Sequence, residues 1–255
     1  MTTNYDKKLM GLLSNHVPGT VLLPSWLEKN GISRDLQQYY LKSGWLESYG
    51  IGAFKRPNEN VRWTGALNSL QRQIKVTVHV GGLTSISLQG LSHYVRMEKE
   101  PIYLFSPQYV KLPKWFLTQE WSNQIVHVKT KFLPANSALF EYSLDGLKLQ
   151  ISSPERAILE CLYLAPDRFD VVECYQILEG LANLRPKILQ ELLENCNSIK
   201  VKRLFLFMAS KARHQWLDFV DQSRIDLGTG DRVIVKGGVY ISKYKISVPK
   251  ELTAQ

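Results

Sequence analysis

The chain has 255 residues, of which 44% are hydrophobic, and a formal net charge of +9 at pH 7. This length and hydrophobic content provide a sizeable core for about two domains, and the positive charge favours an acidic partner such as DNA or RNA. The longest apolar run, residues 204–209, is far shorter than the roughly 20 residues of a membrane span, and the N-terminus lacks the apolar stretch of a signal peptide. We therefore expect a soluble, cytoplasmic protein without a membrane partner.

The first part of the chain is typical of three short helices. Leucines at helical spacing predict a helix over 5–15, which ends at the turn-like HVPGT. A Pro-Ser start and an Asn-Gly stop predict a second helix over 24–30. Ser33 is a suitable cap for a third helix over 34–43, which ends before Gly44. Two short helices separated by a tight turn are typical of a helix-turn-helix.

A predicted hairpin follows the third helix and completes the pattern of a winged helix. Two short β-like runs, 45–49 and 51–55, flank a glycine-containing turn. A fourth helix is predicted over 62–73. We place the domain boundary near residue 76, which divides the chain into a winged helix-turn-helix domain over 1–76 and a C-terminal domain over 77–255.

Beyond this boundary, strand and helix patterns are mixed. Strands are predicted at 76–80, 102–105, 125–130 and 147–151, with a helix at 83–90. A Ser-Pro-Glu start predicts a helix from Ser153, and further helices are predicted over 170–182, 186–196, 198–210 and 213–221, before a β segment over 232–248. The expected fold class is α+β, with an N-terminal winged helix-turn-helix domain followed by a larger mixed α/β C-terminal domain.

The third helix carries a polar, cationic stripe. Ile32, Leu36 and one or both of Tyr39 and Tyr40 are expected to face the core, which leaves the opposite side for contact with DNA. Arg and Gln can read base edges in the major groove, and Lys suits phosphate. The candidate DNA-binding residues are Ser33, Arg34, Gln37, Gln38 and Lys42 on the helix and Tyr49, Lys55 and Arg56 on the hairpin. The alternative is that the winged helix is a protein-interaction module whose basic residues only confer solubility.

Motifs for catalysis are weak. The GGLTS turn from Gly81 could cradle a phosphate, but it lacks the P-loop pattern and favours a packing turn. The histidines show no metal-ligand spacing, and the paired carboxylates of a nucleotidyltransferase are missing. We expect no catalytic residue, metal or cofactor; an enzyme built around the GGLTS turn and His93 is the remaining alternative.

Two sets of side chains in the C-terminal half have open interpretations. Cys161, Cys174 and Cys196 match neither a disulfide framework nor a C-x-x-C motif, so buried, reduced thiols are expected. A cationic series crosses the C-terminal helices and is typical of a solvated face, which could also contact DNA or an acidic partner. It consists of Lys187, Lys200, Lys202, Arg203, Lys211 and Arg213.

Taken together, the segments resemble the AbiEi antitoxin family of type IV toxin-antitoxin systems over nearly the whole chain. The features that carry the resemblance are GWLESYGIGAFKR from Gly44, RWTGALNSLQ from Arg62, HVGGLTSISLQGLSHY from His79, SSPERAILECL from Ser152, VKRLFLFMA from Val201 and IDLGTGDRVIVKGGVY from Ile225. None of them is a catalytic signature. Their order and joint presence make the resemblance specific.

The resemblance implies a non-enzymatic autorepressor that binds inverted repeats of duplex operator DNA in its own promoter. It also implies a C-terminal domain that opposes a cognate AbiEii-like nucleotidyltransferase toxin. The expected association state is a monomer that binds DNA cooperatively. Carried over by position, DNA contact falls on the stripe of the third helix and on the wing. Charge alone assigns toxin antagonism to Lys187, Lys200, Lys202 and Arg203.

Overall fold

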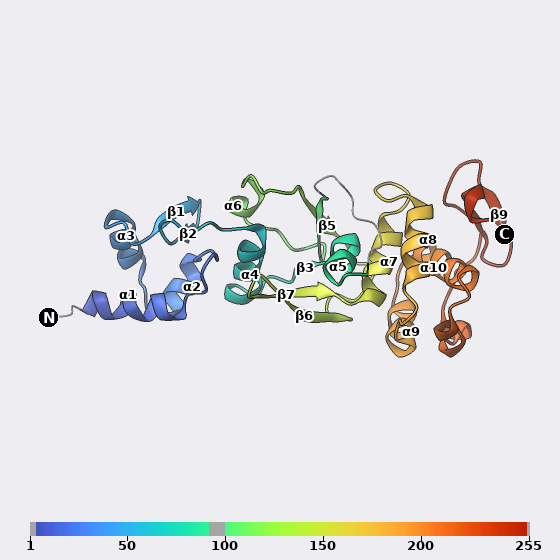
Figure 1. Ribbon diagram of the computed structural model, residues 1–255, viewed down its shortest axis with the longest axis horizontal. Helices are drawn as coiled ribbons and strands as arrows, with labels where there is room; N and C mark the ends of the chain where they lie inside the picture. The colour runs from blue at the N-terminus through green and yellow to red at the C-terminus, as the bar shows by residue number, and fades with distance from the viewer. Residues whose placement is uncertain (1–3, 92–99, 254–255) are drawn as a thin grey trace. The chain divides into compact units, whose positions relative to one another are not determined.

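The structure is a computed structural model that describes residues 4–91 and 100–253 (Figure 1). It contains two compact units. The first comprises the residues up to Val78 together with Tyr109–Ile125 and Glu141–Gln150. The second comprises His79–Gln108, Val126–Phe140 and the residues from Ile151. Helices and strands occur in both units, so the α+β fold class is confirmed.

The first unit begins with three helices and a hairpin, as predicted. Its elements include α1 (Asn4–Asn15), α2 (Pro24–Lys29), α3 (Arg34–Lys42), β1 (Glu47–Gly50), β2 (Ala53–Lys55), α4 (Trp63–Gln73) and the short α6 (Lys114–Leu117). Local signals explain the helix starts: α2 has proline in its first turn, and the Ser33 hydroxyl at the start of α3 accepts a hydrogen bond from the backbone N–H of Leu36. The predicted helices and the hairpin are confirmed within a few residues.

A small hydrophobic core fixes the hairpin to the helices of this unit. Its buried members are Leu12, Leu22, Leu27, Ile32, Leu36, Tyr40, Leu46 and Phe54. The segment before α2 also pairs with β2, because Leu22 and Phe54 exchange backbone hydrogen bonds of 2.8 and 3.0 Å. Helix α3 and the hairpin are therefore anchored in one core rather than joined only by the chain.

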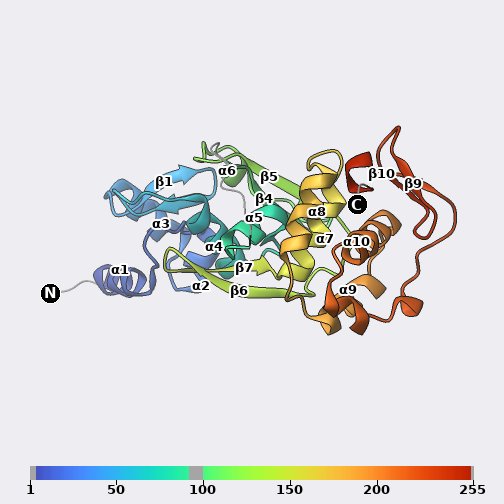
Figure 2. The ribbon, with the colours of Figure 1, turned by 45° about the vertical axis from the view of Figure 1, so that its right-hand side comes forward.

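A mixed five-stranded sheet has the order β5-β4-β3-β7-β6. The strands are β3 (His79–Val80), β4 (Ile102–Ser106), β5 (Ile125–Lys129), β6 (Leu139–Leu144) and β7 (Leu147–Ser152). The central β3 is antiparallel to β4 and parallel to β7, and β6 and β7 run side by side (Figure 2). The edge strand β6 was not predicted, because its exposed polar residues leave it without an apolar alternation.

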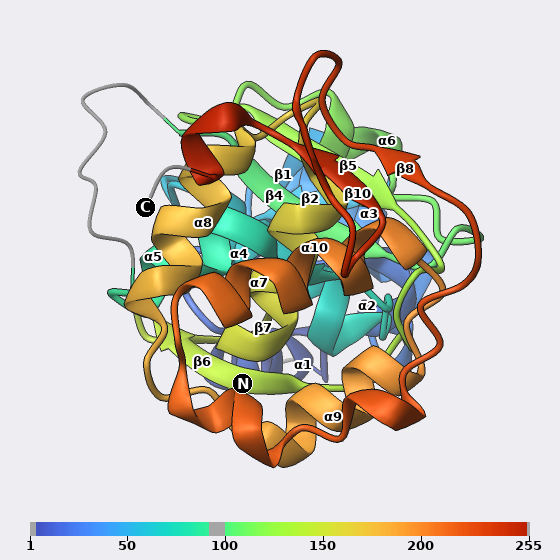
Figure 3. The same ribbon diagram turned by 90° about the vertical axis from the view of Figure 1, so that its right-hand side faces the viewer.

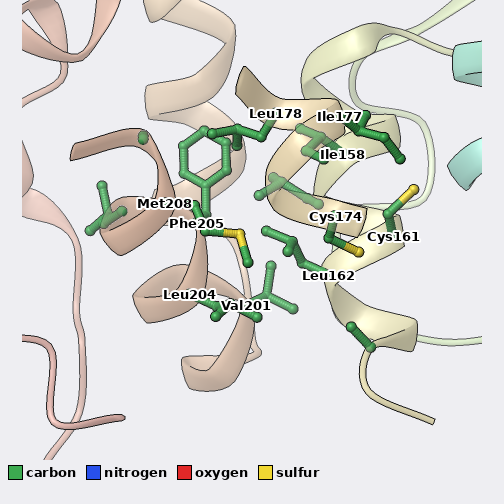
Figure 4. Packing of buried hydrophobic residues seen from close by; sticks show 14 of the residues in the cluster. Ile158, Cys161, Leu162, Cys174, Ile177, Leu178, Val201, Leu204, Phe205 and Met208 are labelled. Carbon is green, nitrogen blue, oxygen red and sulfur yellow. The ribbon is translucent and has the colours of Figure 1, made fainter. Parts of the chain in front are cut away.

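Helices of the second unit pack around α7. They are α5 (Gly82–Leu88), α7 (Pro154–Leu164), α8 (Val171–Gly180), α9 (Pro186–Glu194) and α10 (Ile199–Lys211). Figure 4 shows apolar side chains of α7, α8 and α10 meeting in one buried cluster. The predicted helix over 213–221 is only a 3-10 turn over Gln215–Phe219. No helix in the described part of the chain combines the length and apolarity needed to cross a membrane.

The C-terminal β segment forms a second, three-stranded sheet. It contains β8 (Arg232–Val233), β9 (Val239–Ile241) and β10 (Ile246–Val248). β10 is central, parallel to β8 and antiparallel to β9. The segment lies beside α10 (Figure 3), and the short 3-10 turn Lys250–Leu252 follows it. This confirms the predicted β segment near the C-terminus.

The buried carboxylate of Glu160 on α7 joins several of these elements. It accepts hydrogen bonds from Nε of Arg156 and the hydroxyl of Ser152, both at 2.8 Å, and from the backbone N–H of Gly82 at 2.9 Å. Nε2 of His79 lies 2.8 Å from Oε1 of Glu160, the same oxygen that Arg156 contacts. Burial would raise the pKa of Glu160, but the charges and hydrogen bonds of His79 and Arg156 outweigh it and lower the pKa to about 2.

This carboxylate also explains the GGLTS turn. A Cβ on Gly81 would collide with the Glu160 carboxylate and the Phe105 ring, and the N–H of Gly82 already donates to Glu160. The start of α5, considered above as a phosphate cradle, holds the protein's own anion. The packing interpretation of the turn is therefore the correct one.

Glu160→Gln is expected to lower the free energy of unfolding by about 3–5 kcal/mol at pH 7, because an uncharged amide leaves Arg156 without its buried counter-charge. The folded pKa lies below the ordinary value of 4.5, so the ionised carboxylate contributes its full stability above pH 4.5 and loses it as the pH falls towards 2. Urea unfolding of both proteins should show the difference shrinking over that window. The exposed Glu191→Gln is the control; equal losses in both variants would contradict the assigned role.

Candidate nucleic-acid interface

Helix α3 presents one polar row to solvent. Leu36 and Tyr40 are buried in the core of the first unit, whereas Arg34, Gln38 and Lys42 are exposed. Because residues four apart lie on the same face of a helix, the three exposed side chains form one row along α3. Tyr40 therefore faces the core and Tyr39 faces solvent, which decides between the two alternatives left open by the sequence.

The charges on this row remain accessible to an anionic partner. Nε of Arg34 donates to Oε1 of Glu28 at 2.7 Å, and both side chains are exposed. Such surface pairs contribute at most about 1 kcal/mol, so Arg34 can exchange Glu28 for a group on a ligand at little cost. Within residues 4–91 and 100–253, Lys42 has no ion-pair partner. Asp35 is also exposed beside Arg34, so the positive charge is local rather than extended.

One predicted member of the row is wrong. Gln37 is 1% exposed, and its side-chain amide donates to the backbone carbonyls of Pro24 (3.1 Å) and Ile32 (2.9 Å). These bonds link the start of α2 and the turn before α3 to α3 itself. Gln37 therefore holds the helix-turn-helix together, because buried carbonyls need a donor in the absence of water. The sequence hides this role, since a glutamine among polar neighbours looks like a surface residue.

The predicted wing residues are largely engaged within the unit. Tyr49 is half-buried and its hydroxyl donates to a backbone carbonyl at 3.3 Å. Nζ of Lys55 lies 3.1 Å from a carboxylate oxygen of Glu47, and Nη1 of Arg56 lies 3.5 Å from Glu59. The wing therefore offers fewer available cations than its sequence suggests, and contact of these three residues with DNA stays a prediction.

A segment that is distant in the sequence packs against the hairpin. Trp115 packs edge-on against Tyr49, and the side-chain amide of Gln119 donates to the Tyr49 carbonyl at 2.8 Å. Gly50 has a φ of +134°, and a Cβ there would lie 3.0 Å from the Cβ of Trp115. Only glycine fits this position without strain or a shift. No local sequence signal links residues 115 and 119 to the wing, because the contact is purely tertiary.

Three large apolar side chains of α3, the segment after it and the hairpin are exposed. Ile51 at the tip of the hairpin is 88% exposed, Tyr39 is 55% exposed and Trp45 is 50% exposed. The tip of the hairpin therefore presents a hydrocarbon group rather than a cation.

The cationic series of the C-terminal helices is not one solvated face, contrary to expectation. Lys202 and Arg203 are 3% and 1% exposed. The guanidinium of Arg203 donates to the carbonyls of Leu227, Gly228, Gly230 and Lys245, at 2.7 to 3.0 Å. It therefore holds the glycine-rich loop against α10 as a structural cation.

The two remaining candidates for toxin antagonism differ from each other. The ammonium of Lys200 donates to the carbonyls of Tyr163 and Ala165 at the end of α7, and burial lowers the pKa of Lys200. Lys187 alone among the four is exposed. The charge-based assignment is thus wrong for Lys202 and Arg203 as surface residues and leaves Lys187 as the accessible candidate.

The side chains considered above for catalysis or metal binding are the cysteines and histidines. All three cysteines are buried and unpaired, as predicted, and burial raises the pKa of Cys174 to about 12. In the part of the chain that the structure describes, no three His, Cys, Asp or Glu side chains cluster as metal ligands. His79 faces Glu160, and the hypothesis on His93 lies outside the described residues.

Comparison with known proteins identifies the class and the family. Two models of transcriptional regulators match nearly the whole chain: the AbiEi antitoxin N-terminal domain over residues 5–97, and the AbiEi antitoxin of type IV toxin-antitoxin systems over residues 99–249. The chain is therefore a transcriptional regulator by class. It belongs to the AbiEi antitoxin family, which confirms the resemblance seen in the sequence.

The fold also has a structural relative. The RV2827C protein of Mycobacterium tuberculosis, solved by crystallography, aligns with a TM-score of 0.60 and 13% sequence identity, over 96% of this chain and 92% of that chain. At this identity the similarity concerns the fold alone. No functionally curated protein matches the chain significantly.

Gln37 and Gln38 form a matched pair for testing the geometry of α3. Gln37→Ala is expected to lower the free energy of unfolding by about 1–3 kcal/mol, because two buried carbonyls lose their donor. Gln38→Ala, one residue further on the exposed face, should change it by less than about 0.5 kcal/mol. Denaturant titration measures both. Equal stability of the two variants would show that Gln37 does not have the buried role assigned to it.

Proposed function

We propose that this chain is an autorepressor and antitoxin that binds duplex operator DNA through the exposed row of α3. The observation that carries the proposal is the arrangement of Arg34, Gln38 and Lys42 on one face of a helix that follows a helix and a tight turn, in a member of a family of transcriptional regulators. The following hairpin gives the unit the element order of a winged helix. DNA binding is assigned to residues 1–76 and antitoxin action to residues 77–255.

The three side chains suit different parts of a DNA site. Arg34 can donate two hydrogen bonds to the major-groove edge of guanine, and the amide of Gln38 matches adenine. Lys42, at the end of the helix, suits a backbone phosphate. Ser33 keeps its hydroxyl hydrogen available while its oxygen caps α3, so it can donate to a phosphate. Phosphates then supply affinity, and the row of α3 supplies sequence preference.

The DNA contact that we assign to the hairpin differs from the one predicted from the sequence. Lys55 and Arg56 already have carboxylate neighbours, so a contact with phosphate would have to replace an existing pair. Ile51 at the tip of the hairpin is apolar and exposed. We assign to it van der Waals contact with the sugars of the adjacent minor groove, a contact used by proteins that read groove shape.

We assign the antitoxin action to the C-terminal domain, without enzymatic activity of its own. The opposed partner is an AbiEii-like nucleotidyltransferase toxin, and Lys187 is the exposed one of the four residues predicted for toxin antagonism. A monomer that binds cooperatively at inverted repeats and a cytoplasmic location stay predictions from the family resemblance.

The exposed aromatic residues favour a second candidate function, a protein-interaction module. Tyr39 and Trp45 resemble interface anchors more than phosphate contacts. This alternative predicts that α3 variants lose a protein partner and that no preference for operator DNA exists. The DNA titration below separates the two.

Replacement of Arg34 and Lys42 tests the DNA-binding proposal. With fluorescently labelled duplex from upstream of the gene, Arg34→Ala should weaken binding about 5- to 150-fold and reduce preference over random duplex, because it removes a base contact. Lys42→Ala should weaken binding to both duplexes and reduce the slope of log affinity against log salt by about 0.9, because one phosphate contact is lost. Anisotropy titrations at several salt concentrations measure all of these.

The control is Lys187→Ala, which removes an exposed cation in the other unit and should leave DNA binding unchanged. A wild-type protein that binds operator and random duplex equally would refute sequence-specific repression. Losses of equal size in all three variants would point to general charge rather than to α3.

A further inference from the structure

The C-terminal β segment of the second unit carries a group of exposed positive charges. Residues 231–251 hold five Lys and Arg against two Asp and Glu, which is a net +3 and one-third of the chain's formal charge of +9. The five cations are all exposed: Arg232, Lys236, Lys243, Lys245 and Lys250. None of them forms an ion pair within the described residues, so their charge is available to a partner.

The outer face of the three-stranded sheet exposes one aromatic ring. Ile246 and Val248 of β10 are buried towards the core, which turns Ser247 to the opposite face. Val233 and Tyr240 are the register partners of Ser247 on either side, so both share its outward direction. Val233 is 68% exposed and Tyr240 is 48% exposed.

The Tyr240 ring is held in a fixed geometry. The Tyr240 hydroxyl donates to Oδ1 of Asp231 at 2.7 Å, which orients the ring. Arg203, buried below, donates to the carbonyl of Lys245 and to the loop before β8. A Cβ on Gly238 would collide with the carbonyl of Val248, so the turn before β9 lies close against β10. The surface is thus prearranged, which reduces the entropy lost on binding.

A hollow of about 560 Å³ lies beside this segment. Its lining includes Lys236 and Lys250 together with the carboxylates of Asp170 and Glu251. The charges that line the hollow therefore balance, and the cations available to an anionic partner are those on the exposed surface of residues 231–251.

We propose that this surface binds single-stranded nucleic acid, with Tyr240 stacking on an unpaired base and the surrounding lysines contacting phosphates. Proteins that bind single strands combine these two elements, an aromatic platform and a basic groove. The site lies on a different unit from α3 and does not depend on operator binding. It gives the C-terminal domain a ligand of its own.

Two alternatives fit the chemistry less well. Duplex DNA keeps its bases stacked inside the helix, so an outward tyrosine on a sheet has no base face to meet. Protein interfaces are depleted in lysine, whereas four of the five cations here are lysines, which suit phosphate as point charges. Single strands use both the ring and the ammonium groups.

The test is an anisotropy titration of the full chain with labelled 20-nucleotide single-stranded RNA and DNA of mixed, unstructured sequence, and with the matching duplex DNA. Tyr240→Ala should weaken binding to single strands about 10-fold, and Tyr240→Phe, which keeps the ring, should restore it. Lys243→Ala with Lys245→Ala should weaken binding and reduce the salt slope by about 1.4, the value for two phosphates on a single strand. The RNA and DNA arms show which sugar is preferred.

Two controls make the outcome decisive. Lys187→Ala should leave single-strand binding unchanged, and Arg34→Ala with Lys42→Ala should lose operator binding but retain single-strand binding. Operator binding and single-strand binding are thus measured separately. Failure of the proposed repressor function would appear in the first measurement, and failure of this site in the second. Thermal unfolding confirms that each variant is folded.

The proposal is overturned if the wild-type chain does not bind single strands, if duplex of equal length competes as well as the single strand, or if the Tyr240 and lysine variants match Lys187→Ala. It is also overturned if these variants keep single-strand binding but no longer co-purify with the toxin, because the surface would then be a protein contact.

Discussion

The buried carboxylate of Glu160 is the constraint on which the second unit depends. An ionised carboxylate costs several kcal/mol to bury unless charge and hydrogen bonds compensate for it. Here the compensating groups come from four places: Arg156 one turn earlier on α7, Ser152 at the end of β7, the N–H at the start of α5, and His79 on β3. The parallel pairing of β3 with β7 and the close packing of α5 on α7 bring them together.

The same use of polar side chains as internal supports recurs elsewhere. Arg203 binds four carbonyls beneath the C-terminal sheet, and Gln37 binds two beneath α3. Each links the backbone carbonyls of segments that are separate in the sequence. Much of the polar surface suggested by composition is therefore internal. Among the charges that remain outside are those of α3 in one unit and of the C-terminal β segment in the other.

The functions we propose use two contact surfaces, one on each unit. The row on α3 has few cations on a short helix, which suits selective contact with a duplex. The C-terminal β segment has more charge and an exposed ring, which suits contact with less sequence preference. Each of the two surfaces is built on the core of its own unit.

Several features could be read from the sequence because their causes are local. The cap at Ser33, the proline at the start of α2, the hairpin around Gly50 and the Ser-Pro-Glu start of α7 each depend on neighbours within a few residues. The exposure of Arg34 and Lys42 also follows from the helical period. Family membership was likewise visible, because it rests on the order of several motifs.

What the sequence could not decide was which polar groups face inward. Gln37 and Gln38 are chemically identical neighbours, and only the carbonyls of Pro24 and Ile32 make one of them structural. Trp115 reaches the wing, and Arg203 reaches the loop after Leu227, across long stretches of chain. Helix and turn signals act over a few residues, whereas the partner of a buried polar group is set by the packing of the whole unit. The tertiary structure alone therefore determined which cations are supports and which are available for binding.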